Sequence, residues 1–229
     1  IYAMTGPAVE ISGGSAANTI VGVAAMGGRA EYLGKVRDDQ LGAVFAHDIR
    51  ATGVTYDVAP APDGPATGAC LILVTPDAQR TMNTYLGASV HLGPDDIDRS
   101  RIERASVLYL EGYLFDPPEA QEAFRVAARY AHDAGRIVSA TLSDSFCVER
   151  HRGAFTDLVR NHLDLVFANE AEILALYETD DFEVALGRVR DQVPYAALTR
   201  SEKGSVVVTP EEVIQVPAER VEVLVDTTA

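Results

Sequence analysis

The sequence predicts an α/β fold built on a mostly parallel sheet, with a small β lid beside it. Short apolar runs alternate with amphipathic helical stretches along most of the chain, and this alternation is typical of parallel sheets with helices on both faces. Two β-like segments with no helix between them, within 67–86, predict the lid. The chain of 229 residues, 47% of them hydrophobic and 23% charged, suits a single domain with a sizeable core.

The predicted elements follow one another in a regular order. Pro117-Pro118 opens one helix and Gly135 closes it, as these residues commonly do. The runs at 107–110 and 165–168 are continuously apolar, which predicts strands buried on both faces. The strands are expected at 31–36, 107–110, 137–142, 165–168, 196–199, 205–209 and 221–225. The helices are expected at 19–26, 39–52, 117–134, 155–163, 170–177 and 182–192.

The lid prediction depends on one break in this order. Residues 67–74 and 80–86 form two β segments around a Pro-Asp turn. A hairpin of this kind is read as a flap beside the main sheet, and the alternative is an edge hairpin of that sheet. We place the lid at about 64–88, with part of 1–12 as a further contributor. We expect one domain over 1–229 that is incomplete at both ends, because the chain opens without Met and without a complete first element.

Composition limits the partners. The net charge of −15 argues against binding to a phosphodiester backbone. No apolar run approaches the roughly 20 residues of a membrane span, and no signal peptide precedes the first element. Cys70 and Cys147 are far apart, so neither a disulfide framework nor a Cys-based metal site is expected. We therefore expect a small-molecule substrate, no nucleic-acid or membrane partner, and a cytoplasmic location.

A glycine cluster precedes the first predicted helix. Gly13 and Gly14 allow a tight turn and close approach of the backbone to a ligand. Ser15 is small, and Asn18 carries an amide that suits two neighbouring hydroxyls. The exposed N–H groups of the following helix favour polar or anionic ligand atoms. The alternative is a purely structural Gly-Gly turn at a helix start.

A second cluster follows the predicted buried strand at 165–168. Ligands of open α/β sheets bind outside the carboxyl ends of the strands. Asn169 and Glu172 are three residues apart on an opening helical turn, so they share a face. Oxygen ligands and retained waters suit Mg²⁺. The alternative is an Asn cap with acidic residues that complement the helix dipole.

Two polar turns complete the candidate residues. Thr199 to Ser205 links two predicted strands, and Asp226, Thr227 and Thr228 lie at the end of the chain. Both place hydroxyls and backbone donors at strand ends, where phosphates bind, and both are also compatible with ordinary polar turns. The sequence lacks a P-loop, a dinucleotide fingerprint and a nucleophile elbow. Its five histidines show no zinc-helix spacing.

Taken in order, these clusters resemble the ribokinase-like family of carbohydrate and purine kinases, whose fold is a three-layer sandwich with a small β lid. The resemblance covers nearly the whole chain. Asn169 and Glu172 match the family's Asn-x-x-Glu motif, and Thr199 with Gly204 matches its nucleotide-binding turn. The other matching stretches are Gly13 to Asn18 with Gly27, Gly34 to Asp39 with Gly42, the lid motif Thr67-Gly68, and Val225 to Thr228.

The resemblance implies an ATP-dependent phosphotransferase that moves the γ-phosphate of MgATP to a hydroxyl, typically a primary alcohol. It implies sugar contacts from Gly13, Gly14, Ser15 and Asn18. Asn169, Thr199 and Gly204 would contact the nucleotide, and Glu172 would hold Mg²⁺ through water. Asp226, Thr227 and Thr228 would start the anion hole, with a monovalent cation such as K⁺ nearby. The catalytic Asp is expected just beyond Thr228, so the chain alone is not expected to catalyse transfer.

The adenosine kinase branch is the one that the sequence resembles most. The matching stretches are 66–70, 111–114, 141–143 and 165–170. In that branch an aromatic residue near Tyr113 frames the substrate, whereas Thr141 replaces a frequent Asn. A sugar kinase of the fructokinase or ribokinase type and a non-catalytic ligand-binding homologue remain the alternatives. The family also implies a homodimer in some members, paired through the lid.

Overall fold

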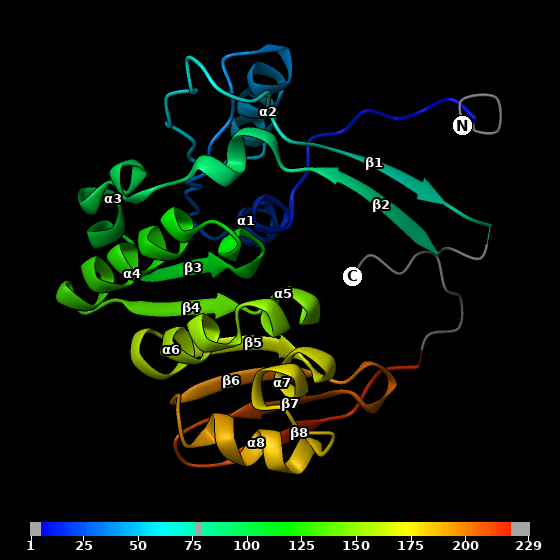
Figure 1. Cartoon of the computed structure of the whole chain (residues 1–229), viewed down its shortest axis with the longest axis vertical. Coiled ribbons are helices and arrows are strands. Elements are labelled where there is room, and N and C mark those ends of the chain that lie inside the picture. The colour runs from blue at the N-terminus through cyan, green and yellow to red at the C-terminus, as the bar shows by residue number, and fades with distance from the viewer. Residues whose placement is uncertain (1–5, 77–78, 221–229) are drawn as a thin grey trace. The chain divides into compact units, whose positions relative to one another are not determined.

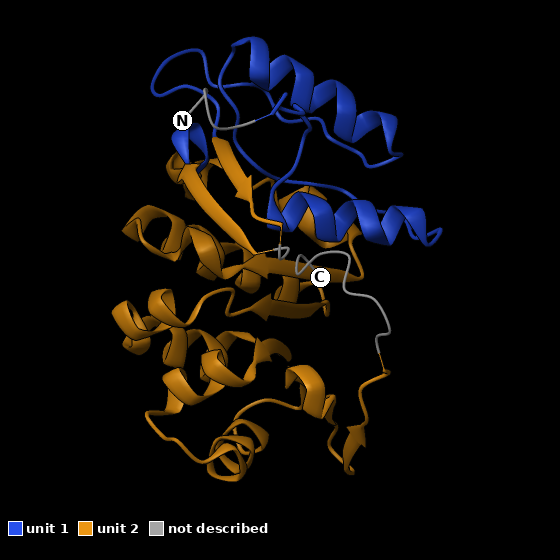
Figure 2. Ribbon diagram, turned by 90° about the vertical axis from the view of Figure 1, so that its right-hand side faces the viewer, with its two compact units in different colours: residues 1–68, 86–89 blue, residues 69–85, 90–229 orange. Residues whose placement is uncertain are grey.

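The computed structural model describes residues 6–76 and 79–220. The chain divides into two compact units, drawn in blue and orange in Figure 2. Unit 1 comprises Ile1–Gly68 and Leu86–Ser89, and unit 2 comprises Ala69–Tyr85 and Val90–Ala229. The strand predicted at 221–225 lies outside the described residues.

Unit 1 contains two helices and extended loops. The helices are α1 (Ser15–Ala25) and α2 (Gln40–Ala51). A small core lies between them, with Ala17, Ile49, Val54 and Tyr56 all at most 4% exposed. The rings of Tyr32, Phe45 and Tyr56 meet at centroid distances of 5.6–5.8 Å.

The strand predicted at 31–36 is wrong. The segment makes only isolated parallel bridges, Glu31 with Thr55 and Arg37 with Ala61. Between them, the Tyr56 hydroxyl donates to the carbonyl of Gly34 at 3.1 Å. The segment is thus bridged at isolated points, which the apolar pattern alone does not distinguish from a strand.

The main sheet lies in unit 2. Its strands follow chain order, β3 to β8. The strands are β3 (Val107–Glu111), β4 (Ile137–Thr141), β5 (Leu165–Asn169), β6 (Tyr195–Thr199), β7 (Ser205–Val208) and β8 (Val213–Val216). β3 to β6 are parallel, and β7 and β8 add antiparallel strands. The predicted mostly parallel sheet is therefore confirmed, and β8 is a strand that the sequence pattern did not predict.

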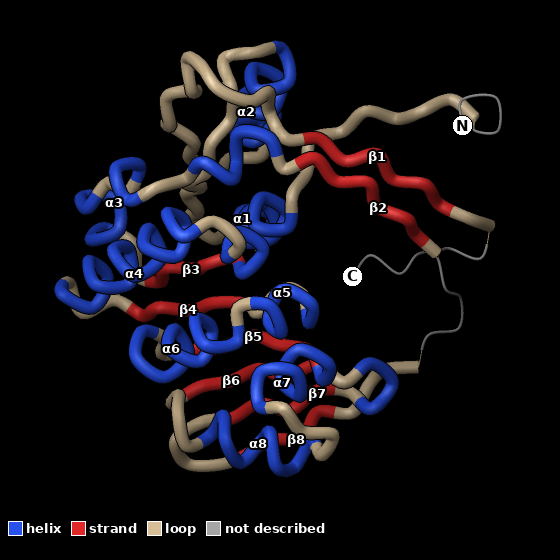
Figure 3. Tube along the Cα trace, viewed as in Figure 1, coloured by secondary structure: helices blue, strands red, loops and turns tan. Residues whose placement is uncertain are grey.

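The helices of unit 2 form one layer beside this sheet (Figures 1 and 3). The helices are α3 (Arg99–Arg104), α4 (Pro118–Asp133), α5 (Ser145–Arg150), α6 (Arg152–His162), α7 (Glu170–Tyr177) and α8 (Phe182–Arg190). Short 3₁₀ turns join the elements. These are η1 (Gly87–His91), η2 (Pro94–Asp96), η3 (Gly112–Phe115) and η4 (Ser201–Lys203). Because the parallel strands follow chain order, right-handed crossovers bring the connecting helices to the same side.

Burial alternates in β5 and β6, whereas three successive residues of β4 are buried. Val166 and Leu198 are fully buried, whereas Phe167 is 36% exposed and Tyr195 44% exposed. The prediction that 107–110 and 165–168 are buried on both faces is therefore wrong. The helical layer covers one face, and apolar side chains remain accessible on the other. None of the helices in the described ranges is long and apolar enough to cross a membrane.

The lid hairpin is present as a separate sheet. It consists of β1 (Ala69–Val74) and β2 (Arg80–Tyr85), which pair antiparallel from Ala69 with Tyr85 to Val74 with Arg80. Both strands pair only with each other among the described residues, so the alternative of an edge hairpin of the main sheet is wrong. Leu71 and Met82 are about half exposed.

Candidate functional site

The carboxyl ends of β3 to β6 bring together most of the predicted residues of unit 2. Parallel strands end at the same edge of a sheet. The strand register shows which residues lie side by side at that edge. Glu111 pairs with Thr141, and Asn169 pairs with Thr199. The segments that follow these four strand ends carry Tyr113, the helix α7 and the turn before β7.

Asn169 and Glu172 form a reciprocal capping box at the start of α7. The Asn169 amide oxygen accepts from the Glu172 N–H at 2.9 Å. The Glu172 carboxylate accepts from the Asn169 N–H at 3.0 Å and from its side-chain amide at 2.7 Å. The hydrogen bonds of this pair are therefore those of a helix cap, which was the alternative interpretation made from the sequence. A ligand role for the pair stays a prediction.

Glu172 nevertheless differs from an ordinary helix cap, because it is only 5% exposed. Burial raises the pKa of its carboxyl, the backbone hydrogen bond from Asn169 opposes this, and the negative charges of Asp144 and Glu111 raise the pKa further. Three carboxylates thus lie near one another at the ends of β3, β4 and β5. A cation would relieve this repulsion.

Glu111 is the second buried carboxylate at this edge, at 8% exposure. The Ser143 hydroxyl donates to its Oε1 at 2.5 Å, and the Tyr109 hydroxyl donates to its Oε2 at 3.3 Å. Ser143 has a positive φ of 69°, which is uncommon for a residue other than glycine. The loop after β4 is therefore bent so that its hydroxyl reaches the end of β3.

Tyr113 lies in η3, directly after Glu111, and is 44% exposed. Burial raises the pKa of its phenol, and the charges of Asp144, Glu111 and Glu172 add to the effect. The predicted substrate contact and the carboxylates therefore share one neighbourhood. Among the described residues, no group of three or more His, Cys, Asp or Glu side chains is arranged to hold a metal ion directly.

The predicted nucleotide turn lies between β6 and β7. Gly204 has φ +86°, and a Cβ there would lie 2.0 Å from the carbonyl oxygen of Val216. Only glycine fits this turn. Thr199 is exposed at the end of β6. A hollow of about 400 Å³ lies beside the turn. It is lined by Ser201, Glu202, Ala218, Glu219 and Arg220.

Ion pairs join this turn to α7. Arg200 donates to the Glu170 carboxylate at 2.8 Å, and Lys203 donates to it at 3.3 Å. The Arg200 guanidinium also lies over the ring of Phe182, 3.7 Å from its centroid. The hydrogen bond from Arg200 lowers the pKa of Glu170, burial opposes this, and Lys203 lowers it further.

The glycine cluster belongs to unit 1. Gly14 has φ +118° and stands at the start of α1, where no side chain caps the helix. Gly13, Ser15 and Asn18 are exposed. The N–H of Asn18 donates to the carbonyl of Gly14 at 2.8 Å. The cluster is thus an uncapped helix start, which agrees with either interpretation made from the sequence.

Thr67 of the lid motif has a definite structural role in unit 1. Its hydroxyl donates to Asp39 Oδ1 at 2.7 Å, and its N–H donates to Asp39 Oδ2 at 2.9 Å. Asp39 also caps α2 by accepting from the N–H of Gly42. A Cβ at Gly42 would lie 2.1 Å from the carbonyl oxygen of Arg37. The first signature and the lid motif are therefore one hydrogen-bonded junction.

Sequence reasoning assigned no role to several residues at the sheet edge. Glu111 and Ser143 belong only to stretches that carry the resemblance, Glu170 is only a neighbour of Asn169 there, and Asp144 has no part in it. The available signal was position, since all four lie within two residues of the end of a predicted strand. Asp226, Thr227 and Thr228 lie outside the described residues.

The family model described as pfkB family carbohydrate kinase matches residues 7–229. The chain belongs to this family. The predicted resemblance to ribokinase-like kinases is thereby confirmed, and the two sheets agree with that fold. The chain spans less than two thirds of the length of the curated relatives that it matches first. One of these is an ATP-dependent ribose-1-phosphate kinase from Halopiger xanaduensis, 29% identical over 205 residues that make up 88% of this chain and 63% of that protein.

Two solved structures match this pfkB-family chain nearly throughout. The adenosine kinase from Sinorhizobium meliloti is 54% identical with a TM-score of 0.93, over 99% of this chain and 70% of that one. A probable sugar kinase from Rhizobium etli is 53% identical with a TM-score of 0.93, over 99% of this chain and 69% of that one. The two names differ in substrate class, so the likeness does not distinguish a nucleoside from a sugar.

Proposed function

We propose that the protein to which this chain belongs transfers the γ-phosphate of MgATP to a hydroxyl, a primary alcohol, of a nucleoside such as adenosine. The observation that carries the proposal is the pairing of Asn169 with Thr199 at one sheet edge, beside the buried carboxylates Glu111 and Glu172. Ligands of α/β folds bind at this edge. Family membership supports phosphotransfer as the reaction.

The nucleotide is assigned to the β5 and β6 side of the edge. Thr199 is exposed there, Gly204 permits the tight turn, and a hollow adjoins it. Asn169 would orient the phosphates, and Glu172 would hold Mg²⁺ through water. When bound, Mg²⁺ shields the negative charge of the phosphates. The chain's own residues fix the position of the nucleotide, in line with a reaction that depends on positioning and electrostatics.

Contacts with the acceptor are proposed for each unit by itself. In unit 2 the contact is Tyr113, and in unit 1 it is the glycine cluster, where the exposed Asn18 amide suits two neighbouring hydroxyls. The anion hole that starts at Asp226, Thr227 and Thr228, the catalytic Asp beyond them and a K⁺ ion remain proposals that rest on the family resemblance. A lid-paired homodimer and a cytoplasmic location remain proposals of the same kind. Cys70 and Cys147 are both free thiols, which supports a reducing compartment.

A sugar acceptor is the second candidate, because the probable sugar kinase is almost as similar as the adenosine kinase. A panel of nucleosides and sugars, assayed for ADP release by the complete protein, distinguishes the two. We expect acceptor-dependent ADP release that needs Mg²⁺ and is fastest with a nucleoside. A folded protein that binds ligands of the panel but releases no ADP would instead be the non-catalytic homologue.

The assignment of Asn18 has its own test. Asn18→Ala should raise the KM for the acceptor about tenfold or more, since a site built to bind hydroxyls loses two hydrogen bonds. The KM for ATP should stay nearly constant. Thr19→Ala is the matched control, because Thr19 is its exposed neighbour on α1 and its hydroxyl bonds only to the Ser15 carbonyl. Equal effects of Asn18→Ala on both KM values would refute the role.

A further inference from the structure

The turn that carries Tyr113 is too short to hold its own shape. It is the four-residue 3₁₀ segment η3 (Gly112–Phe115), which leaves β3 and reaches Asp116. Short 3₁₀ turns have poor hydrogen-bond geometry and depend on their surroundings. The position of Tyr113 must therefore come from contacts that other elements make with the two ends of the turn.

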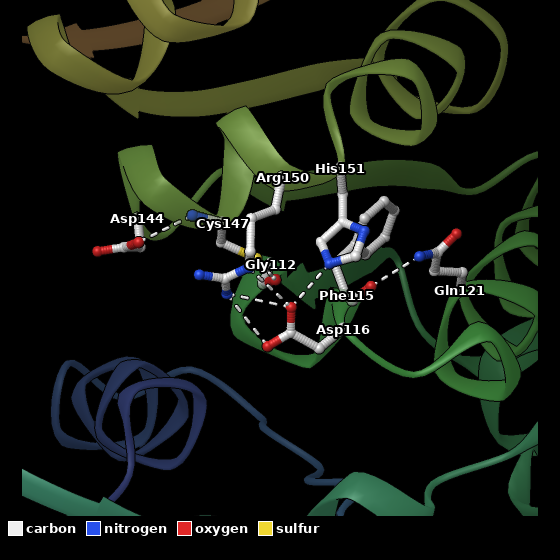
Figure 4. Close-up of polar contacts among 8 residues, drawn as sticks. All are labelled: Gly112, Phe115, Asp116, Gln121, Asp144, Cys147, Arg150 and His151. Carbon is white, nitrogen blue, oxygen red and sulfur yellow. Dashed lines mark hydrogen bonds and ion pairs between the residues drawn. The ribbon is translucent and has the colours of Figure 1, made fainter.

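Helix α5 supplies contacts at both ends of η3 (Figure 4). At the start of the turn, the Cys147 thiol donates to the carbonyl of Gly112 at 3.7 Å. At its end, Arg150 donates to both carboxylate oxygens of Asp116 at 3.1–3.3 Å. His151 Nε2 lies 2.7 Å from Asp116 Oδ1. One carboxylate thus meets two basic side chains from a single helix end.

The helix is itself fixed to the sheet edge. Asp144 caps α5 by accepting from the Cys147 N–H at 2.9 Å. The turn approaches the end of β4 so closely that a Cβ at Gly112 would lie 2.7 Å from the carbonyl oxygen of Thr141. Because the start of α5 is fixed at the sheet edge, the contacts of Arg150 and His151 with Asp116 tie the end of η3 to a held helix.

The last residue of the turn is anchored in the core. Phe115 is 1% exposed, and its ring stacks on Phe155 at a centroid distance of 4.2 Å. Gln121 donates to its carbonyl at 2.7 Å. Tyr113 therefore stands between a buried anchor and a thiol contact, and it is the one exposed residue of the turn.

We propose that Asp116 is a positioning residue for the acceptor side of the site. With Arg150 and His151 it forms a clamp, the Asp116 clamp, that fixes η3 and thereby Tyr113 and the adjoining Glu111. Asp116 acts through these residues and does not touch the substrate. This inference rests on the proposed function, because it assigns the acceptor to the Tyr113 side.

The surroundings of Asp116 favour a clamp that stays charged. Burial raises the pKa of its carboxyl, but the hydrogen bonds from His151 and Arg150 outweigh this, so the pKa lies below its ordinary value. The Asp116 side chain is 48% exposed. Ion pairs with such exposure add little to global stability. Removing the clamp should therefore leave the fold intact and affect the turn.

The clamp is also separated from the nucleotide side. β3 and β6 are three strand spacings apart in the sheet, which is about 14 Å at the usual spacing. Asp116 follows β3, whereas the nucleotide turn follows β6. A displacement of η3 should therefore weaken acceptor binding and leave ATP binding unchanged.

The test uses the complete protein with Asp116→Asn, and Asp157→Asn as a matched control. Asp157 is similarly exposed, at 41%, and it too faces an Arg and a His. In the described part of the chain, its hydrogen-bond and ion-pair partners are Arg125, Asn161 and His162, which lie outside η3. We expect Asp116→Asn to raise the KM for the acceptor about fivefold or more, with the KM for ATP changed less than about twofold. Asp116→Glu, which keeps the carboxylate, should recover part of the loss.

A second readout is amide hydrogen exchange over 112–116, which needs no activity. Asp116→Asn should speed exchange there, and Asp157→Asn should not. The inference is overturned if Asp116→Asn matches the control in both readouts or raises both KM values equally. If the wild-type protein phosphorylates no acceptor, the proposed function fails. In that case hydrogen exchange still tests the clamp, because unchanged exchange at 112–116 in Asp116→Asn would overturn it.

Discussion

The two halves of the sheet edge are held together in different ways. The loops after β3 and β4 share buried contacts, which are the Ser143–Glu111 hydrogen bond, the Cys147–Gly112 contact and the Phe115–Phe155 stack. The loops after β5 and β6 are joined by the ion pairs of Glu170. Packed contacts do not depend on salt, whereas ion pairs weaken as salt screens them. The acceptor side combines such packing with the exposed Asp116 clamp, whereas partly buried ion pairs join the loops of the nucleotide side.

The largest expected effect is loss of the buried anchor on the acceptor side. Phe115→Ala should lower the free energy of unfolding by about 3–5 kcal/mol, because a fully buried aromatic ring leaves a cavity. Phe146→Ala is the control, since Phe146 lies on the adjoining α5 and is 68% exposed. Its effect should stay within about 0.5 kcal/mol. Urea unfolding measures both, and equal effects would contradict a packed acceptor side.

The second-largest loss of stability is expected from a substitution in the turn on the nucleotide side. Gly204→Ala should cost about 1–3 kcal/mol of stability through its positive φ and the clash with the Val216 carbonyl. The same unfolding assay checks it. Gly187→Ala in α8 meets nothing within 4 Å and should be neutral or stabilising. If Gly204→Ala were also neutral, the turn would not have the geometry described.

A pH series tests burial on the acceptor side. Burial raises the pKa of the Cys147 thiol from 9.0 to about 11. For an acid whose pKa is raised on folding, the folded state binds more protons, so stability falls as pH rises between these values. From pH 8 to pH 10.5 the wild-type protein should lose about 1–2 kcal/mol more than Cys147→Ala does. Parallel losses in both proteins would show that the thiol is not buried against Gly112.

The smallest effect is expected from the ion pairs on the nucleotide side. Glu170→Gln should lower stability by about 0.2–1 kcal/mol at low salt, and the difference should shrink as salt rises, because salt screens ion pairs and Lys203 is 54% exposed. Ser143→Ala on the acceptor side provides the contrast, with a cost that salt leaves unchanged. A salt-independent cost for Glu170→Gln would remove the distinction between the two halves.

Much of the fold was predictable because local pattern and topology agree. Chain order, helix caps such as Asp39 and the glycines that end helices follow from short-range rules. Around 31–36 the chain makes only isolated bridges, to Thr55 and Ala61, and the local pattern does not reveal how far such long-range pairing extends. The exposure of one face of the strands was also not predicted, because a continuous apolar run does not indicate whether helices cover one face of the sheet or both.

The residues of the candidate site also fall into two groups, those that the sequence pattern predicted and those to which it gave no role. The location of Asn169, Glu172, Thr199 and Gly204 at the sheet edge was predictable, because their motifs lie at the ends of predicted strands, and their ligand roles stay predictions. Glu111 and Asp116 were not assigned, since their importance depends on partners that lie about 30 or more residues away. Spacing along the chain carries no signal for such contacts.

The most direct test of the proposed kinase site is transfer of labelled γ-phosphate from ATP by the complete protein, with the product identified by mass spectrometry. We predict a phosphorylated primary hydroxyl on a nucleoside or sugar, formed only with Mg²⁺. We also predict that Glu172→Gln slows it while the protein remains folded. No labelled acceptor from a broad panel, or full activity of Glu172→Gln, would contradict the assignment of this sheet edge.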